Sequence, residues 1–301
     1  MQLGFVSAIL PDWPLSDILK FAADEGFACV EVMCWPTGGA ARRYAGVTHL
    51  DVSRLDADSL GTVRDLVRKH GVAISGLGYY PNPLHPDADH RRLVVEHLKQ
   101  VIRAAGALGI GVVNTFIGRD PQLSIPANWP LLQQTWPAII ELAEKTGVHI
   151  GIENCPMLFS LDEWPGGCNL AVSPAVWQQL FETLPSKNLG LNIDPSHLIW
   201  QHIDYVRCIR EFGKRIVHVH AKDTRIDVDK IYSHGILGLG WHTAKLPGLG
   251  DVSWGQFFSA LSDTGYKGPV CIEVEDRAYE GSDADRLRAL RQSKRYLEQF
   301  M

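Results

Sequence analysis

The chain alternates from end to end between short apolar runs and longer segments with helical spacing. Eight runs have the length and apolar content of buried strands, over residues 3–8, 28–33, 73–80, 111–118, 149–154, 189–194, 216–223 and 269–276. Segments with apolar residues three and four apart predict helices over 15–25, 59–70, 90–108, 129–146, 174–183, 205–212, 254–264 and 283–300. About 45 residues rich in Gly and Trp separate the seventh run from the eighth; they include the helix at 254–264 and form the longest insertion.

Eight strand–helix pairs without a linker between them favour one α/β domain. Neither composition nor charge shifts between the halves of the chain, and a closed (β/α)₈ TIM barrel fits this order better than a doubly wound sheet. We therefore expect a single barrel domain over residues 1–301. In such a barrel the loops that follow the strands form the active face, so residues at strand ends converge on one mouth.

Composition narrows the functional classes. The 301 residues are 46% hydrophobic and 21% charged, as in an ordinary soluble protein. The net charge of -5 leaves no basic surplus for a phosphate backbone, so nucleic acid is not expected as a partner. No apolar run approaches the roughly 20 residues that span a bilayer. Six cysteines without a CxxC pair and a first segment without signal-peptide features predict a cytoplasmic protein in a reducing compartment.

Ligand-type residues stand near the ends of the last four predicted strands. They are Glu153, Asp194, His218 or His220, and Glu273 or Glu275. In IVHVHAKD both histidines lie on one strand face, because side chains alternate with a period of two, and the two glutamates are related in the same way. Spacing alone therefore leaves the choice within each pair open. Three carboxylates and one imidazole suit Mn²⁺ best, also Mg²⁺ or Co²⁺, and Zn²⁺ less well.

Several motifs occur in a characteristic order: GFACVEV, IEN, NIDPSH, HVHAKD, PGLGDVSW and GYKGPVCIEVED. Together they resemble the xylose isomerase-like TIM barrel superfamily, and most closely its sugar phosphate isomerase/epimerase group. The resemblance runs along nearly the whole chain. It implies that the metal ligands are Glu153, Asp194, His220 and Glu273. It also implies that Glu153 and Glu273 form the acid/base pair, that His197 binds a substrate hydroxyl or carbonyl, and that the protein forms a homodimer.

The expected activity is isomerisation or epimerisation of a sugar or sugar phosphate. A divalent ion that chelates a hydroxyl and the adjacent carbonyl acidifies the carbon-bound proton and stabilises an enediolate. One feature departs from the resemblance: the ketose 3-epimerase branch has a second Glu six residues after the strand-5 ligand, where this chain has Phe159. The alternative is a lyase that acts on a keto-sugar, a keto-inositol or a 3-keto-glycoside by β-elimination.

Further residues near the predicted mouth are candidates for substrate binding. Lys222 and Asp223 could hold a phosphate or keto group, although a loop ion pair explains them equally well. The other candidates are Arg225 for an anionic substrate, Glu31 at the end of the second run, and Trp35, Trp164 and Trp241 for stacking on sugar faces. An endonuclease IV-type phosphodiesterase needs three zincs and extra histidines after strands three and four, and GLGYY and NTFIG contain none.

Overall fold

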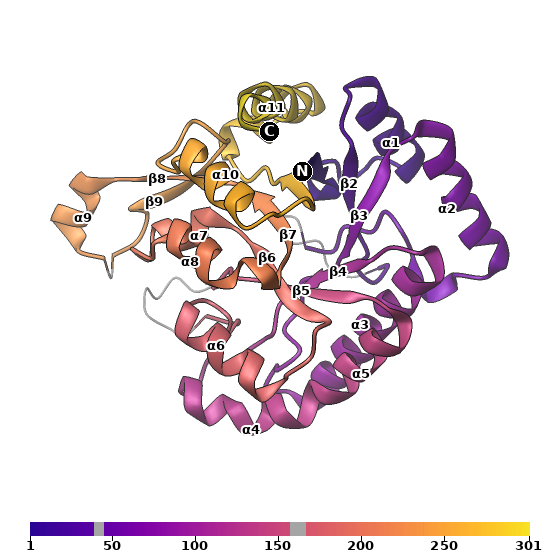
Figure 1. Cartoon of the computed structure of the whole chain (residues 1–301), viewed down its shortest axis with the longest axis horizontal. Coiled ribbons are helices and arrows are strands. Elements are labelled where there is room, and N and C mark those ends of the chain that lie inside the picture. The colour runs from indigo at the N-terminus through magenta and orange to yellow at the C-terminus, as the bar shows by residue number, and fades with distance from the viewer. Residues whose placement is uncertain (39–44, 157–166, 237) are drawn as a thin grey trace.

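The computed structural model describes residues 1–38, 45–156, 167–236 and 238–301, and its central feature is a closed barrel of parallel strands (Figure 1). Around the barrel the strand order is β1-β10-β7-β6-β5-β4-β3-β2, and β1 pairs with both β10 and β2 to close the ring. The strands are β1 (Gln2–Val6), β2 (Cys29–Met33), β3 (Ala73–Gly78), β4 (Val112–Thr115), β5 (His149–Glu153), β6 (Leu189–Ile193), β7 (Ile216–Ala221) and β10 (Pro269–Ile272).

Most residues of the barrel strands are buried. Every residue of β2 and β6 is buried, and the helices cover the outer face of the barrel. The eight predicted runs coincide with these strands, each within a few residues at its end. The predicted TIM barrel is therefore confirmed.

Most of the predicted helices are also present. They are α1 (Leu15–Asp24), α2 (Ala57–His70), α3 (Ala88–Leu108), α6 (Pro174–Thr183), α8 (Tyr205–Phe212), α10 (Trp254–Asp263) and α11 (Asp283–Leu297). Their ends follow local chemistry: Asp87 caps α3 by accepting a hydrogen bond from His90 N (2.7 Å), and Gly109 ends it with φ of 73°. Among the described residues, no helix has the length and apolar character needed to cross a bilayer.

The single helix expected over 129–146 was wrong. The structure has two helices, α4 (Ile125–Thr135) and α5 (Pro137–Thr146), with Trp136 between them. Pro137 has no N–H to continue the α4 ladder, but its fixed φ suits the first position of a new helix. Pro130, the second residue of the expected helix, lies inside α4.

The long insertion has secondary structure that the sequence pattern did not predict. After β7 the chain forms an antiparallel pair, β8 (Asp223–Ile226) and β9 (His242–Lys245), with α9 (Val228–His234) between them. This arm projects from the barrel on the left of Figure 1. A short helix, α7 (Pro195–Ile199), follows β6 and contacts β8, so the arm and α7 together stand beside the carboxyl ends of the strands.

Candidate metal centre and the cavity beside it

Four side chains from neighbouring strands meet at the carboxyl end of the barrel. Glu153 ends β5, Asp194 follows β6, His220 lies near the end of β7 and Glu273 follows β10. Each offers one ligand atom, and these atoms all lie within 4.8 Å of one another. Glu153, Asp194 and His220 are buried, whereas the side chain of Glu273 is 20% exposed. The barrel therefore brings together the four residues that the sequence singled out.

The donor set fits a divalent cation. His220 Nδ1 lies 3.6 Å from Glu153 Oε1 and 3.5 Å from Glu273 Oε2. His220 Nδ1 is a buried atom that has no hydrogen-bonding partner among the described residues. Since buried polar atoms are normally paired, such an atom beside three carboxylates indicates a site that a cation would complete. Carboxylate oxygens and a neutral imidazole are suitable ligands for such an ion.

Two asparagines hold the strand ends that carry the carboxylates. Asn154 accepts a hydrogen bond from Asp194 N (2.8 Å) and donates one to Asp194 O (2.9 Å). Asn169 donates to Glu153 O (2.9 Å) and Cys155 O (2.7 Å). Asp194 Oδ1 also caps α7 by accepting from Ser196 N (2.8 Å). No sequence pattern indicated these roles for Asn154 and Asn169, although Asn154 belongs to the IEN motif.

The structure distinguishes His220 from His218. His218 Nδ1 lies 3.1 Å from Asn192 Oδ1 and His218 Nε2 lies 3.2 Å from Ser75 Oγ, so both ring nitrogens have partners. Burial lowers the pKa of His218 to about 4, so this imidazole is neutral. His220, two residues further along β7, is the histidine among the four grouped residues.

Lys222 is buried against the same cluster. Its Nζ lies 2.6 Å from Glu273 Oε2, 3.0 Å from Asp194 Oδ2 and 3.1 Å from Glu275 Oε2. Burial lowers the pKa of Lys222, but the neighbouring carboxylates outweigh burial and raise that pKa well above its usual value. The ammonium group therefore neutralises part of the negative charge at this end of the barrel.

The two candidate acid/base carboxyls have different environments. Burial raises the pKa of Glu153, but the neighbouring imidazoles of His197 and His220 and the Lys222 ammonium outweigh burial and hold that pKa well below its usual value. Burial raises the pKa of Glu273 to about 7, even though Lys222 and His220 act in the opposite direction. Two carboxyls whose pKa values are pushed apart are a common arrangement in sites that transfer protons.

A cavity of about 270 Å³ opens beside the four grouped residues. Its lining comprises Cys155, Pro156, Ser196, His197, Trp200, Lys222, Thr224, His242, Ala244 and Glu275. His197 connects it to the cluster, with Nε2 at 3.6 Å from Glu153 Oε1 and 3.5 Å from Asp194 Oδ2. Trp200 of α7 stacks on His242 of β9 at a centroid distance of 4.6 Å and an interplanar angle of 5°. The arm thus supplies a wall of the cavity that the sequence did not predict.

Other candidates do not line this cavity. The Asp223 carboxylate faces the 248–254 loop and accepts hydrogen bonds from it, and Arg225 is exposed on β8. Trp35 packs edge-on against Tyr79 (5.0 Å), and Trp241 is buried with its Nε1 donating to Ile236 O (3.0 Å).

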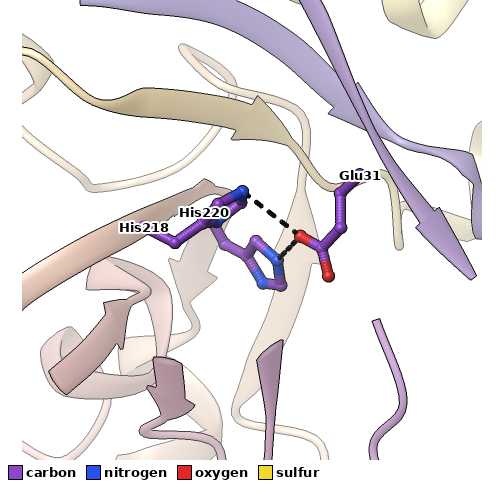
Figure 2. A group of neighbouring side chains, drawn as sticks. All are labelled: Glu31, His218 and His220. Carbon is purple, nitrogen blue, oxygen red and sulfur yellow. Dashed lines mark hydrogen bonds and ion pairs between the residues drawn. The ribbon is translucent and has the colours of Figure 1, made fainter. Parts of the chain in front are cut away.

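Glu31 is fully buried beneath His220, with Glu31 Oε2 2.7 Å from His220 Nε2 (Figure 2).

Phe159 and Trp164 are outside the described residues.

The chain resembles known proteins along most of its length. It is 27% identical to the uncharacterized protein YfiH of Bacillus subtilis (strain 168), over 92% of this chain and 93% of that protein. It is 32% identical to the inosose dehydratase of Clostridium tetani (strain Massachusetts / E88), over 32% of this chain and 34% of that protein.

Solved structures share the fold at low sequence identity. A D-psicose 3-epimerase determined in the presence of D-fructose superposes with a TM-score of 0.72 and 16% identity, covering 98% of each chain. The IolI protein with a bound zinc atom gives a TM-score of 0.72 and 17% identity, covering 100% of this chain and 99% of that chain. The family profile described as xylose isomerase-like TIM barrel matches residues 19–300. The chain therefore belongs to the xylose isomerase-like TIM barrel family.

Proposed function

We propose that this protein is a divalent-metal-dependent isomerase or epimerase of a sugar or sugar phosphate. The observation that carries the proposal is the meeting of Glu153 and Glu273 around His220 Nδ1, beside a cavity of about 270 Å³. The epimerase among the solved relatives supports the same class of chemistry. The substrate is a polyol that has a carbonyl next to the carbon that loses its proton.

Glu153, Asp194, His220 and Glu273 would hold the cation, and Mn²⁺ is our first candidate because three of the four donors are carboxylates. When bound, a divalent ion polarises the substrate carbonyl and so acidifies the neighbouring C–H. The relative with a bound zinc atom supports a divalent metal in general.

The protein side chains would supply the proton transfers and orient the substrate. Glu153, whose lowered pKa keeps it ionised, has the charge state needed to accept a proton, and Glu273, whose pKa is about 7, can carry a proton near neutrality. His197 and Lys222 line the cavity and contact the ligand carboxylates, so each can donate a hydrogen bond to a substrate oxygen. The burial of these groups strengthens their electrostatic effect on the substrate.

A lyase is the second candidate, and Lys222 is the specific reason. A buried ammonium group that lines the cavity and lies 2.6 Å from Glu273 can protonate a departing hydroxyl after the carbon-bound proton has been removed. The inosose dehydratase relative supports this reading.

Incubation in D₂O with Mn²⁺ and candidate ketoses, sugar phosphates, keto-inositols and 3-keto-glycosides tests the proposal. Deuterium in a recovered sugar, without loss of a leaving group, supports isomerisation or epimerisation. Loss of water or of an aglycone, with an ultraviolet-absorbing enone, identifies a lyase instead. Protein that binds Mn²⁺ but exchanges no proton in any of these substrate classes would refute both candidates.

Variants at the acid/base residues test their assignment. Glu153→Gln and Glu273→Gln should each lower the exchange rate by at least 100-fold, since general acid–base catalysis typically contributes about 10²–10⁴-fold. Glu141→Gln is the control, because Glu141 is exposed on α5, lies outside the four grouped residues and does not line the cavity. Wild-type exchange by either of the first two variants would show that the assignment is wrong.

A further inference from the structure

We propose that Glu31 is a positioning residue that orients His220 and presents its Nδ1 to the metal. The inference rests on the metal dependence proposed above. It replaces the expectation that Glu31 binds substrate at the mouth. Glu31 belongs to β2 and reaches across the barrel interior to β7, as Figure 2 shows.

The contact between the two side chains determines which ring nitrogen carries hydrogen. Glu31 Oε2 lies 2.7 Å from His220 Nε2, and both side chains are 0% exposed. An ionised carboxylate can only accept a hydrogen bond, so Nε2 must be the donor. In the neutral ring Nδ1 then has the free lone pair, and it is Nδ1 that lies 3.6 Å from Glu153 Oε1 and 3.5 Å from Glu273 Oε2. The Glu31 carboxylate would thus hold the His220 imidazole through Nε2 while Nδ1 faces the metal.

Other neighbours of Nε2 do not reverse this assignment. Tyr80 OH lies 3.3 Å from Nε2, but it donates its proton to Glu31 Oε1. Asn192 Nδ2 lies 3.0 Å from Nε2 and has the Tyr80 oxygen, 3.4 Å away, as an acceptor. The carboxylate contact is the shortest of the three, and its charge strengthens it.

Glu31, His218 and His220 are close enough together to be considered as a second metal site, but the pattern of partners argues against one. His218 uses both ring nitrogens for Asn192 and Ser75, and Glu31 uses both oxygens for Tyr80 and His220. Among the described residues, the unpartnered ring nitrogen of His220 is Nδ1, which faces the other cluster.

The space around Glu31 is also closed to a ligand. A Cβ added at Gly78 would lie 2.6 Å from Glu31 Oε1 and 2.2 Å from Met33 Cε. Since the Glu31 side chain is also 0% exposed, a substrate cannot reach it, so Glu31 acts on the site through His220.

Metal titration of the Glu31→Gln variant tests the inference. The amide keeps the size of the side chain but loses the charge, so we expect affinity for Zn²⁺ and Mn²⁺ to fall 10–100-fold. Tyr80→Phe is the matched control, because it removes a partner of the same carboxylate and keeps the charge. We expect its affinity to stay within threefold of the wild type. Equal affinities of Glu31→Gln and wild type would overturn the inference.

Nitrogen-15 NMR of the Zn²⁺-loaded wild type gives an independent measurement that needs no variant. It should show His220 with zinc on Nδ1 and a strongly deshielded proton on Nε2. Zinc on Nε2, or a proton on Nδ1, would overturn the inference while leaving the proposed function in place. Wild-type protein that binds neither cation would overturn both.

Discussion

Asp223→Asn should strongly destabilise the fold, because the Asp223 carboxylate is a buried acceptor for four donors. Oδ1 accepts from Thr224 N (2.8 Å) and Val252 N (3.0 Å), and Oδ2 accepts from Gly248 N (2.9 Å) and Trp254 Nε1 (2.9 Å). In Asn the NH₂ group replaces one oxygen, so two buried N–H donors face another donor. Each unsatisfied donor costs about 1–3 kcal/mol, which predicts a loss of roughly 2–6 kcal/mol in the free energy of unfolding.

Urea denaturation at pH 7 measures this loss as a lower midpoint at an unchanged slope. Asp251→Asn is the matched control, because Asp251 lies in the same loop, is exposed and accepts one hydrogen bond, from Ile226 N (2.7 Å). The control should lose less than about 1 kcal/mol, since an amide oxygen still accepts that bond. If Asp223→Asn unfolds within about 1 kcal/mol of the control, the structural role assigned to Asp223 is wrong.

Two further predictions concern buried charge. Lys222→Met should destabilise the protein by about 3–5 kcal/mol without added metal, because it leaves buried carboxylates uncompensated. Added Mn²⁺ should then raise the melting temperature of Lys222→Met more than that of Lys245→Met, a control in which the lysine has one partner carboxylate. An equal rise in the two variants would contradict this prediction. Burial lowers the pKa of His49, whose ring nitrogens contact Ser7 Oγ and Leu10 O (both 2.9 Å). The His49 imidazole therefore binds a proton more readily in the unfolded chain than in the folded protein. The free energy of unfolding should fall as pH drops below about 6.5, and it should fall less in His49→Gln. Parallel pH profiles of the two proteins from urea denaturation would refute this prediction.

The barrel and the four strand-end residues could be predicted because both follow from short-range pattern. A parallel strand buried on both faces needs a largely apolar run, and β2 and β6 have one in the sequence, interrupted by Glu31 in β2 and by Asn192 in β6. Strand ends in a closed barrel meet at one mouth whatever the loops do. The position of Glu153 at the end of its run therefore predicted that its side chain lies near the side chains at the ends of the next three runs.

Short-range pattern failed where the outcome depends on distant partners. β8 and β9 are four residues each and form a strand pair only because Asp223–Ile226 meets His242–Lys245. The boundary between α4 and α5 could not be predicted from local sequence, because Pro130 and Pro137 are equally suited to begin a helix. In the structure Pro137 begins α5. In the sequence Asp223 follows the HVHAK stretch and so resembles a site residue. In the structure its carboxylate instead accepts a hydrogen bond from Gly248 N of a distant loop.

The sequence by itself determined the fold class and the strand ends that carry acids and imidazoles, because hydrophobic period and chain order are local properties. The spacing left His218 and His220 equivalent and the resemblance implied His220, but only the tertiary structure shows how the surroundings of the two rings differ. The two residues share a strand face but differ in depth along the barrel by roughly 6–7 Å. At one depth the ring is held by Asn192 and Ser75; at the other it lies between Glu31 and the carboxylates at the mouth.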